Sequence, residues 1–224
     1  MTSTDKGIEP AAATAAPVAP PASATGVAWG NSGPICLGGF ATTTFMLSMV
    51  NANLVPAVLT TTVLAVALMF GGLAQLIGGI LQLRIGNTFG GALFTGFGAF
   101  WLSIWVWGQL YLAPLVLIHQ AGHALGLLLY AFGIFAVVIF LASFRTSVAV
   151  VIALLLLVAA LFILAAGNYG GSTGLIKTGG WIGIVLAGFA FYLALAELCA
   201  VEYGREILPV GHLAKTPGES LGEE

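Results

Sequence analysis

The chain has 224 residues, of which 59% are hydrophobic and only 6% are charged. A soluble domain carries about 25% charged residues, so this composition excludes a water-soluble globular protein. A net charge of −2 with only six Lys plus Arg excludes a nucleic-acid reader, which needs a basic face.

The two ends of the chain differ from its middle. Residues 1–30 are rich in Ala, Pro, Thr and Ser, and they hold too little apolar area to offset the entropy of ordering. We therefore predict a disordered tail there, and it lacks the unbroken apolar core of a signal peptide. Residues 205–224 form a second polar tail, and one membrane domain spans residues 31–204.

The membrane domain contains six stretches that are apolar over about the 20 residues a helix needs to cross the hydrocarbon core. Their uniform apolarity excludes a transmembrane barrel, whose strands alternate. The sequence therefore predicts an all-α polytopic membrane protein with six transmembrane helices. The predicted spans are roughly Pro34–Val50, the stretch after Pro56 to Leu83, Thr88–Leu112, Gly122–Phe144, Ser147–Gly167 and Gly179–Glu202.

The basic residues predict the orientation of this domain. With six helices, one side of the membrane carries five of the six basic residues and the other side carries only Lys177. Cytoplasmic loops hold an excess of Lys and Arg. We therefore predict that both termini are cytoplasmic. The five basic residues on that side are Lys6, Arg84, Arg145, Arg205 and Lys215.

The helices are almost free of chemistry that needs charge. No Asp or Glu occurs between Pro10 and Ala196, which argues against a carboxylate relay or a cation site in the membrane. No His–Glu cluster has zinc spacing, so we expect neither a metal nor a cofactor. An intramembrane enzyme is also disfavoured, because the helices offer no nucleophile with an adjacent base.

Neutral polar residues and aromatics remain as candidates for a pathway. Gln75 and Gln82 are seven residues apart and share one helix face, which either lines a pore or joins helices. Thr43 and Thr44 offer hydroxyls on the first helix. The aromatic stripe through Phe94, Phe97, Trp101 and Trp105 either packs or forms an apolar constriction.

Small residues recur at spacings that permit close helix contact. Gly179, Gly183 and Ala187 follow one another every four residues. Ladders of this kind let backbones approach and often build oligomers. We therefore expect this ladder to contribute to subunit contacts.

Several motifs in one order resemble the acetate uptake transporter family, also called succinate–acetate permeases. The segment Asn31–Gly38 resembles the family's N-P-A-P-L-G-L signature, with matches at Asn31, Pro34, Leu37 and Gly38. Further similarity lies at 71–75, 86–90, 180–183 and 192–209. The resemblance implies a homo-hexamer in which each subunit has six helices around a narrow pore that passes acetate and related small carboxylates.

The resemblance also implies site residues. The family's apolar constriction falls on Phe40, Phe97 and Leu157, and Phe97 stands where the family commonly has Tyr. Gln75 matches a glutamine of the second helix. Glu197 matches an acid near the inner end of the last helix. Thr43, Thr44 and Trp101 complete the expected pathway.

Glu197 has two readings, a proton-handling group or an ion pair with Arg84 or Arg145 near the cytoplasmic surface. The expected function is transport of small carboxylates across the cell membrane, as a proton-coupled symporter or a passive anion channel. The alternative is a structural or sensory membrane oligomer without conduction. The expected partners are the carboxylate, with or without a proton, and the lipid bilayer.

Overall fold

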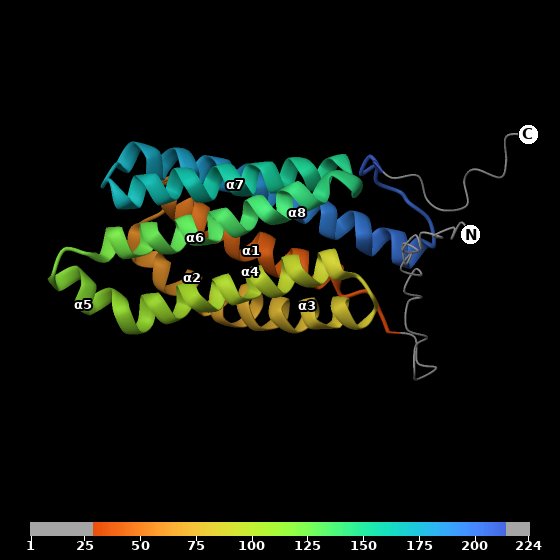
Figure 1. Ribbon diagram of the computed structural model, residues 1–224, viewed down its shortest axis with the longest axis horizontal. Coiled ribbons are helices and arrows are strands. Elements are labelled where there is room, and N and C mark those ends of the chain that lie inside the picture. Colours follow the sequence, from red (N-terminus) through yellow and green to blue (C-terminus); the bar gives the residue numbers. More distant parts are fainter. Residues whose placement is uncertain (1–28, 214–224) are drawn as a thin grey trace, which may run out of the picture.

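The computed structural model describes residues 29–213. Within them, six helical spans are long and apolar enough to cross a membrane, and they lie along one another in a single bundle (Figure 1). The fold class predicted from the sequence is confirmed. The predicted tails lie largely outside the described residues, which exclude 1–28 and 214–224.

Each span is a single helix or a run of consecutive helices. The first, fifth and sixth spans are α1, α7 and α8, the second runs from η1 to α3, the third from α4 to α5, and the fourth from α6 to η4. The helices are α1 (Gly33–Asn51), η1 (Ala57–Leu59), α2 (Thr60–Leu68), η2 (Met69–Ala74), α3 (Gln75–Arg84), α4 (Thr88–Val106), η3 (Trp107–Tyr111), α5 (Leu112–Leu117), α6 (Ala121–Ala142), η4 (Ser143–Arg145), α7 (Val148–Tyr169) and α8 (Thr173–Tyr203).

Two predicted boundaries are wrong. The third span continues to Leu117 instead of ending near Leu112, and its helix passes through Pro114. Proline is tolerated there because it lies in the first turn of α5 and follows the π-helical η3, where the regular hydrogen-bond pattern is already shifted. The sixth span begins at Thr173 rather than Gly179, because Ser172 accepts a hydrogen bond from the Leu175 amide and caps the helix.

The second span contains a π-helical segment, η2, directly before Gln75. Single π-helical turns inside α-helices are frequent at functional sites. The helix packs closely at this point, since a Cβ on Gly39 of α1 would lie 2.6 Å from the Phe70 carbonyl oxygen. The π segment sets the rotation with which α3, and therefore Gln75, faces the interior of the bundle.

The glycine ladder of α8 packs inside the subunit. A Cβ on Gly183 would collide with the Ser48 side chain of α1, and one on Gly180 would enter the backbone at Ala52. Gly179 lies against Leu164 of α7, with its Cβ position 2.6 Å from Leu164 Cγ. The expectation that this ladder serves subunit contacts is therefore corrected: it lets α8 approach α1 and α7 of the same chain.

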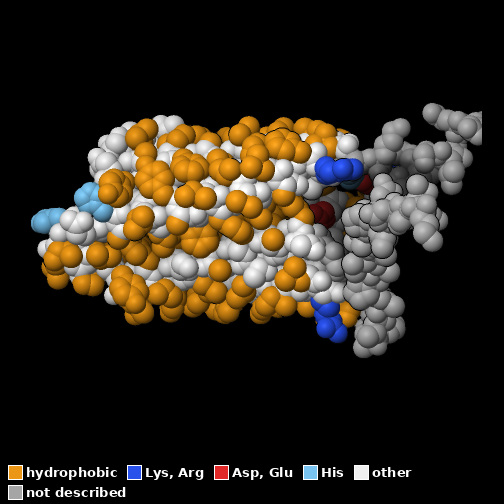
Figure 2. All heavy atoms as spheres, viewed as in Figure 1, with side chains coloured by type: hydrophobic (Ala, Val, Ile, Leu, Met, Phe, Trp, Pro, Cys, Tyr) orange, Lys and Arg blue, Asp and Glu red, His pale blue; other side chains and the backbone are white. Residues whose placement is uncertain are grey.

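The surface of the bundle has the polarity of a membrane protein. On the face shown in Figure 2, hydrophobic side chains cover the flank, Lys and Arg gather near one end, and His lies at the other. Arg84 ends α3 and Arg145 follows α6, so both mark the same end of the bundle. The guanidinium of Arg84 lies 4.9 Å from the centre of the Trp29 ring, a cation–π contact at the edge of the apolar band.

The chain after α8 turns back onto the bundle. Gly204 ends α8 in the left-handed conformation, with φ of 64°. The segment that follows, residues 205–213, is here called the C-terminal strap. The carbonyl oxygens of Gly211 and Val210 accept from the Val148 and Ala149 amides at 2.7 and 3.1 Å. These amides belong to the first turn of α7 and have no partner within the helix.

Candidate functional site: two cavities along the bundle

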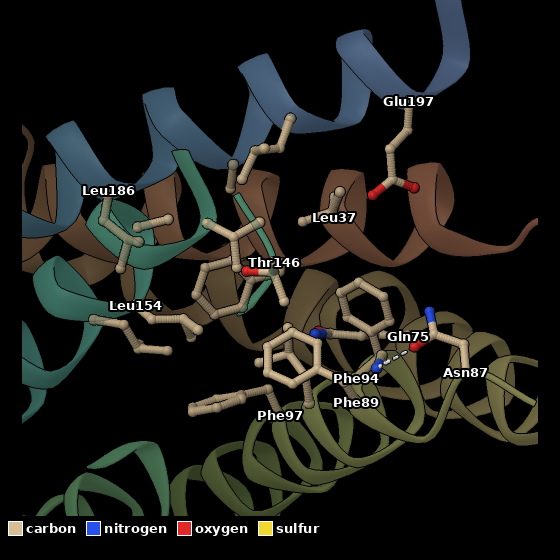
Figure 3. A pocket seen from close by; sticks show the side chains of 18 residues that line it. Leu37, Gln75, Asn87, Phe89, Phe94, Phe97, Thr146, Leu154, Leu186 and Glu197 are labelled. Carbon is tan, nitrogen blue, oxygen red and sulfur yellow. Dashed lines mark hydrogen bonds between the residues drawn. The ribbon is translucent and has the colours of Figure 1, made fainter. Parts of the chain in front are cut away.

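A cavity of about 280 Å³ lies inside the bundle, between α1, α3, α4, α7 and α8. It is called the inner cavity because it reaches the end of the bundle that carries Arg84 and Arg145. Its wall is mostly apolar, and Glu197 is its only charged side chain among the residues described (Figure 3). Figure 3 shows Glu197 and Asn87 toward one end of the cavity and Leu186 toward the other.

A second cavity of about 50 Å³ continues along the bundle toward the opposite end. This outer cavity is lined by Thr44, Ser48 and Asn51 of α1 and by Trp101 of α4, among others. The Thr44 hydroxyl and the Trp101 indole nitrogen are both buried without a hydrogen-bond partner in the described structure. Two unpartnered donors in a small cavity suit an acceptor such as a carboxylate or water.

An apolar partition separates the two cavities. Three side chains, Phe40, Leu157 and Leu186, line both cavities and therefore stand between them. All three are buried. Phe97 lines the inner cavity only, is fully buried, and meets Phe40 edge-on with ring centres 5.9 Å apart. The resemblance named Phe40, Phe97 and Leu157 but did not point to Leu186.

Gln75 lines the inner cavity at the start of α3 and is 1% exposed. Its side-chain oxygen is buried and has no hydrogen-bond partner in the described structure. An amide left unpaired in an apolar interior costs about 1 to 3 kcal/mol. The missing partner of this oxygen distinguishes Gln75 from a buried glutamine that is fully paired with protein.

Gln82 shows that contrast, since it is equally buried but fully paired. Its side-chain amide is hydrogen-bonded to Asn31 at 2.7 Å, to Ser32 at 3.0 Å and to Asn87 at 2.7 Å. The Gly33 and Gly90 amides donate to the oxygens of Asn31 and Asn87, which fixes both side chains. The interpretation that the side chain joins neighbouring segments therefore holds for Gln82.

Glu197 lies at the end of this polar network. Its Oε2 accepts a hydrogen bond of 3.2 Å from Asn31 Nδ2. Neither Arg84 nor Arg145 pairs with it, and the ion pair found among the described residues joins His212 to Glu206. The alternative reading of Glu197 as an ion pair with either arginine is therefore not supported, and the side chain lines the inner cavity instead.

The other predicted residues are distributed between the cavities and the packing around them. Leu37 lines the inner cavity, and Thr44 and Trp101 line the outer one. Thr43 lines neither, because its hydroxyl donates to the Gly39 carbonyl at 2.8 Å and its side chain abuts Gly71 of η2. The remaining signature residues are structural: Pro34 lies in the first turn of α1 and Gly38 faces the Phe70 ring.

Residues 13–215 match the GPR1/FUN34/yaaH family. The chain belongs to this family. Its relatives in the GPR1/FUN34/yaaH family include the succinate-acetate/proton symporter SatP of Escherichia coli K12, which is 33% identical over 81% of this chain and 95% of that protein. Acetate permease A of Emericella nidulans is 30% identical over 84% of this chain and 67% of that one.

A third relative has a different name, the ammonia transport outward protein 2 of Saccharomyces cerevisiae. It is 33% identical over 75% of this chain and 61% of its own length. Among solved structures, the bacterial acetate channel SatP superposes with a TM-score of 0.73 at 30% identity, covering 82% of this chain and all of that chain. The predicted resemblance to acetate uptake transporters is confirmed, and these relatives are transporters or channels rather than enzymes.

Proposed function

We propose that this chain carries acetate and related small monocarboxylates across the membrane through the inner and outer cavities of each subunit. One observation supports this most: two cavities lie end to end inside the bundle of a GPR1/FUN34/yaaH protein, and the three described side chains that line both of them are apolar. A short methyl-bearing acid suits the apolar partition better than a hydrated ion does. The same fit disfavours a purely structural oligomer.

The hydrogen-bonding capacity of Gln75 favours the protonated acid in the inner cavity. A side-chain amide can pair with a carboxylic acid through two hydrogen bonds, N–H to carbonyl oxygen and O–H to amide oxygen. A carboxylate has no proton to donate and would leave the buried Gln75 oxygen unpaired. This argument supports proton-linked transport over passage of the bare anion.

Glu197 also supports proton-linked transport, and it lines the inner cavity at the end opposite Leu186. An ionised carboxylate there repels an incoming carboxylate, so a neutral Glu197 favours entry. The other helices of the inner cavity, α1, α3, α4 and α7, contribute three titratable side chains, which are Cys36, Arg84 at the end of α3 and the distant Tyr169 at the far end of α7. We propose that Glu197 takes up and releases the proton that accompanies the substrate.

Purified protein in liposomes tests this function. Labelled acetate should enter faster than into protein-free liposomes, and an inward proton gradient should raise the initial rate further. Entry at the protein-free rate would refute transport. Entry that exceeds that rate but does not respond to the gradient would refute the proton linkage and favour the passive channel.

Substitution of Gln75 tests whether its side-chain amide binds acetate. Gln75→Ala and Gln75→Met both remove the amide, and Met also keeps the volume, so we expect each to lower acetate flux about tenfold at sub-saturating acetate. Flux of the purified, correctly assembled variants in liposomes measures this. If Gln75→Met carries acetate at the wild-type rate, the amide has no role in binding and only fills space.

We also propose that the subunits form a hexamer in the plasma membrane with both termini in the cytoplasm. The basic end of the bundle and the family resemblance support this arrangement. Native mass spectrometry in mild detergent should give a mass of six chains, and a reporter after Glu224 should be active only in the cytoplasm. A stable monomer across detergents, or an external reporter signal, would contradict the respective statement.

A further inference from the structure

Leu186 stands in the apolar partition on the side of α8. It is 2% exposed and lines both the inner and the outer cavity, a property it shares with Phe40 and Leu157. A side chain that borders two cavities is part of the wall between them. In Figure 3, Leu186 lies at the end of the inner cavity opposite Glu197.

One face of α8 lines the inner cavity from the partition to the end at which Glu197 lies. Leu186, Ala190, Leu193 and Glu197 recur every three or four residues, which places them on one face. Eleven residues of helix separate the first from the last, about 16 Å. Of the two side chains nearest the partition, Ala190 is too small to obstruct it, so Leu186 is the bulky side chain of α8 there.

We propose that Leu186 is a size-selecting residue of the transport pathway, closing the partition on the α8 side against carboxylates longer than acetate. This inference rests on the proposed function. Its physical basis is steric, because Leu186 lines both cavities together with Phe40 and Leu157, so its branched four-carbon side chain occupies space on the path between them. Leu186 would discriminate among short-chain monocarboxylates by their chain length.

Two leucines of α8 allow a matched test in proteoliposomes. Leu186 lines both cavities, whereas Leu193, 4% exposed, lines only the inner one. The measured quantity is the ratio of butyrate flux to acetate flux, with the leak of protein-free vesicles subtracted. We expect Leu186→Ala to raise this ratio about tenfold or more, as for the discrimination of one or two methylenes, and Leu193→Ala to leave it near the wild-type value.

A substitution in the opposite sense completes the test. Leu186→Phe should lower the ratio of propionate flux to acetate flux, and Leu186→Val should raise the butyrate ratio less than Leu186→Ala does. If Leu186→Ala fails to assemble, Leu186→Val still tests whether a smaller side chain raises the flux ratio, and Leu186→Phe tests whether a larger one lowers it. Equal ratios in the Leu186→Ala and Leu193→Ala proteins, or no opposite shift with Phe, would overturn the assignment. Absence of acetate flux in the wild-type protein would instead refute the proposed function itself.

Discussion

Replacing Glu197 by Gln should raise acetate exchange at high pH more than at low pH. Glu197 is the one charged side chain of the inner cavity, and its carboxylate would oppose an incoming carboxylate by roughly 2 kcal/mol, about thirtyfold in rate. This penalty is present above the pH at which Glu197 ionises and disappears below it. The amide of Gln keeps the shape and never carries the charge, so exchange at pH 8 should rise toward the rate at pH 5.

Acetate exchange between equal concentrations, with the same pH on both sides, measures this effect without a driving gradient. Glu202→Gln is the matched control, because Glu202 lies on the same helix, is exposed and does not line the cavity. In this control the pH profile should match the wild type. An unchanged profile in Glu197→Gln would show that another group, or the titration of acetate itself, sets the dependence. Transport driven uphill by a proton gradient should also be lost in Glu197→Gln.

Leu157→Ala should enlarge the range of acids that pass. Leu157 is 6% exposed and borders both cavities, so truncation joins them across the partition. We expect acetate flux to rise and the ratio of lactate flux to acetate flux to increase about tenfold. Because the removed atoms face cavities, the loss of stability should stay near the lower end for a buried leucine, about 2 kcal/mol.

Competition of lactate or succinate against labelled acetate measures the widened selectivity, and size-exclusion chromatography checks assembly. Leu154→Ala is a suitable comparison, since Leu154 lies on the same helix and lines only the inner cavity. If Leu157→Ala destroys the assembly, the residue is a packing core residue and the pathway lies elsewhere. Intact protein with wild-type flux and selectivity would place the constriction at other residues.

The sequence was sufficient to predict the six spans because each is a long apolar run between polar breaks, and this signal depends little on tertiary structure. It failed at the ends of two spans. The sequence placed the start of the sixth span at Gly179, after Lys177, yet α7 ends at Tyr169 and the Ser172 cap already starts α8 at Thr173. Pro114 looked like a helix end because the π segment before it has no clear sequence signal.

The site was harder to predict, because lining a cavity is a property of several helices together. Gln75 and Gln82 share one predicted helix face and are equally buried. Only the structure shows that the Gln75 oxygen lacks a hydrogen-bond partner while the Gln82 amide is paired. Thr43 and Thr44 are neighbours, and a rotation of 100° separates the packing residue from the cavity residue. The spacing of Leu186, Ala190, Leu193 and Glu197 was visible in the sequence, but most faces of an apolar helix look alike.

The C-terminal strap makes the order of synthesis matter for this protein. The first turn of α7 obtains partners for the Val148 and Ala149 amides from Gly211 and Val210, more than 60 residues later in the chain. While the ribosome is still translating α8, those amides must therefore rely on water at the membrane surface. This end of α7 is completed only when nearly the whole polypeptide has emerged, so a chain truncated before residue 210 would carry all six spans and still lack a finished fifth helix.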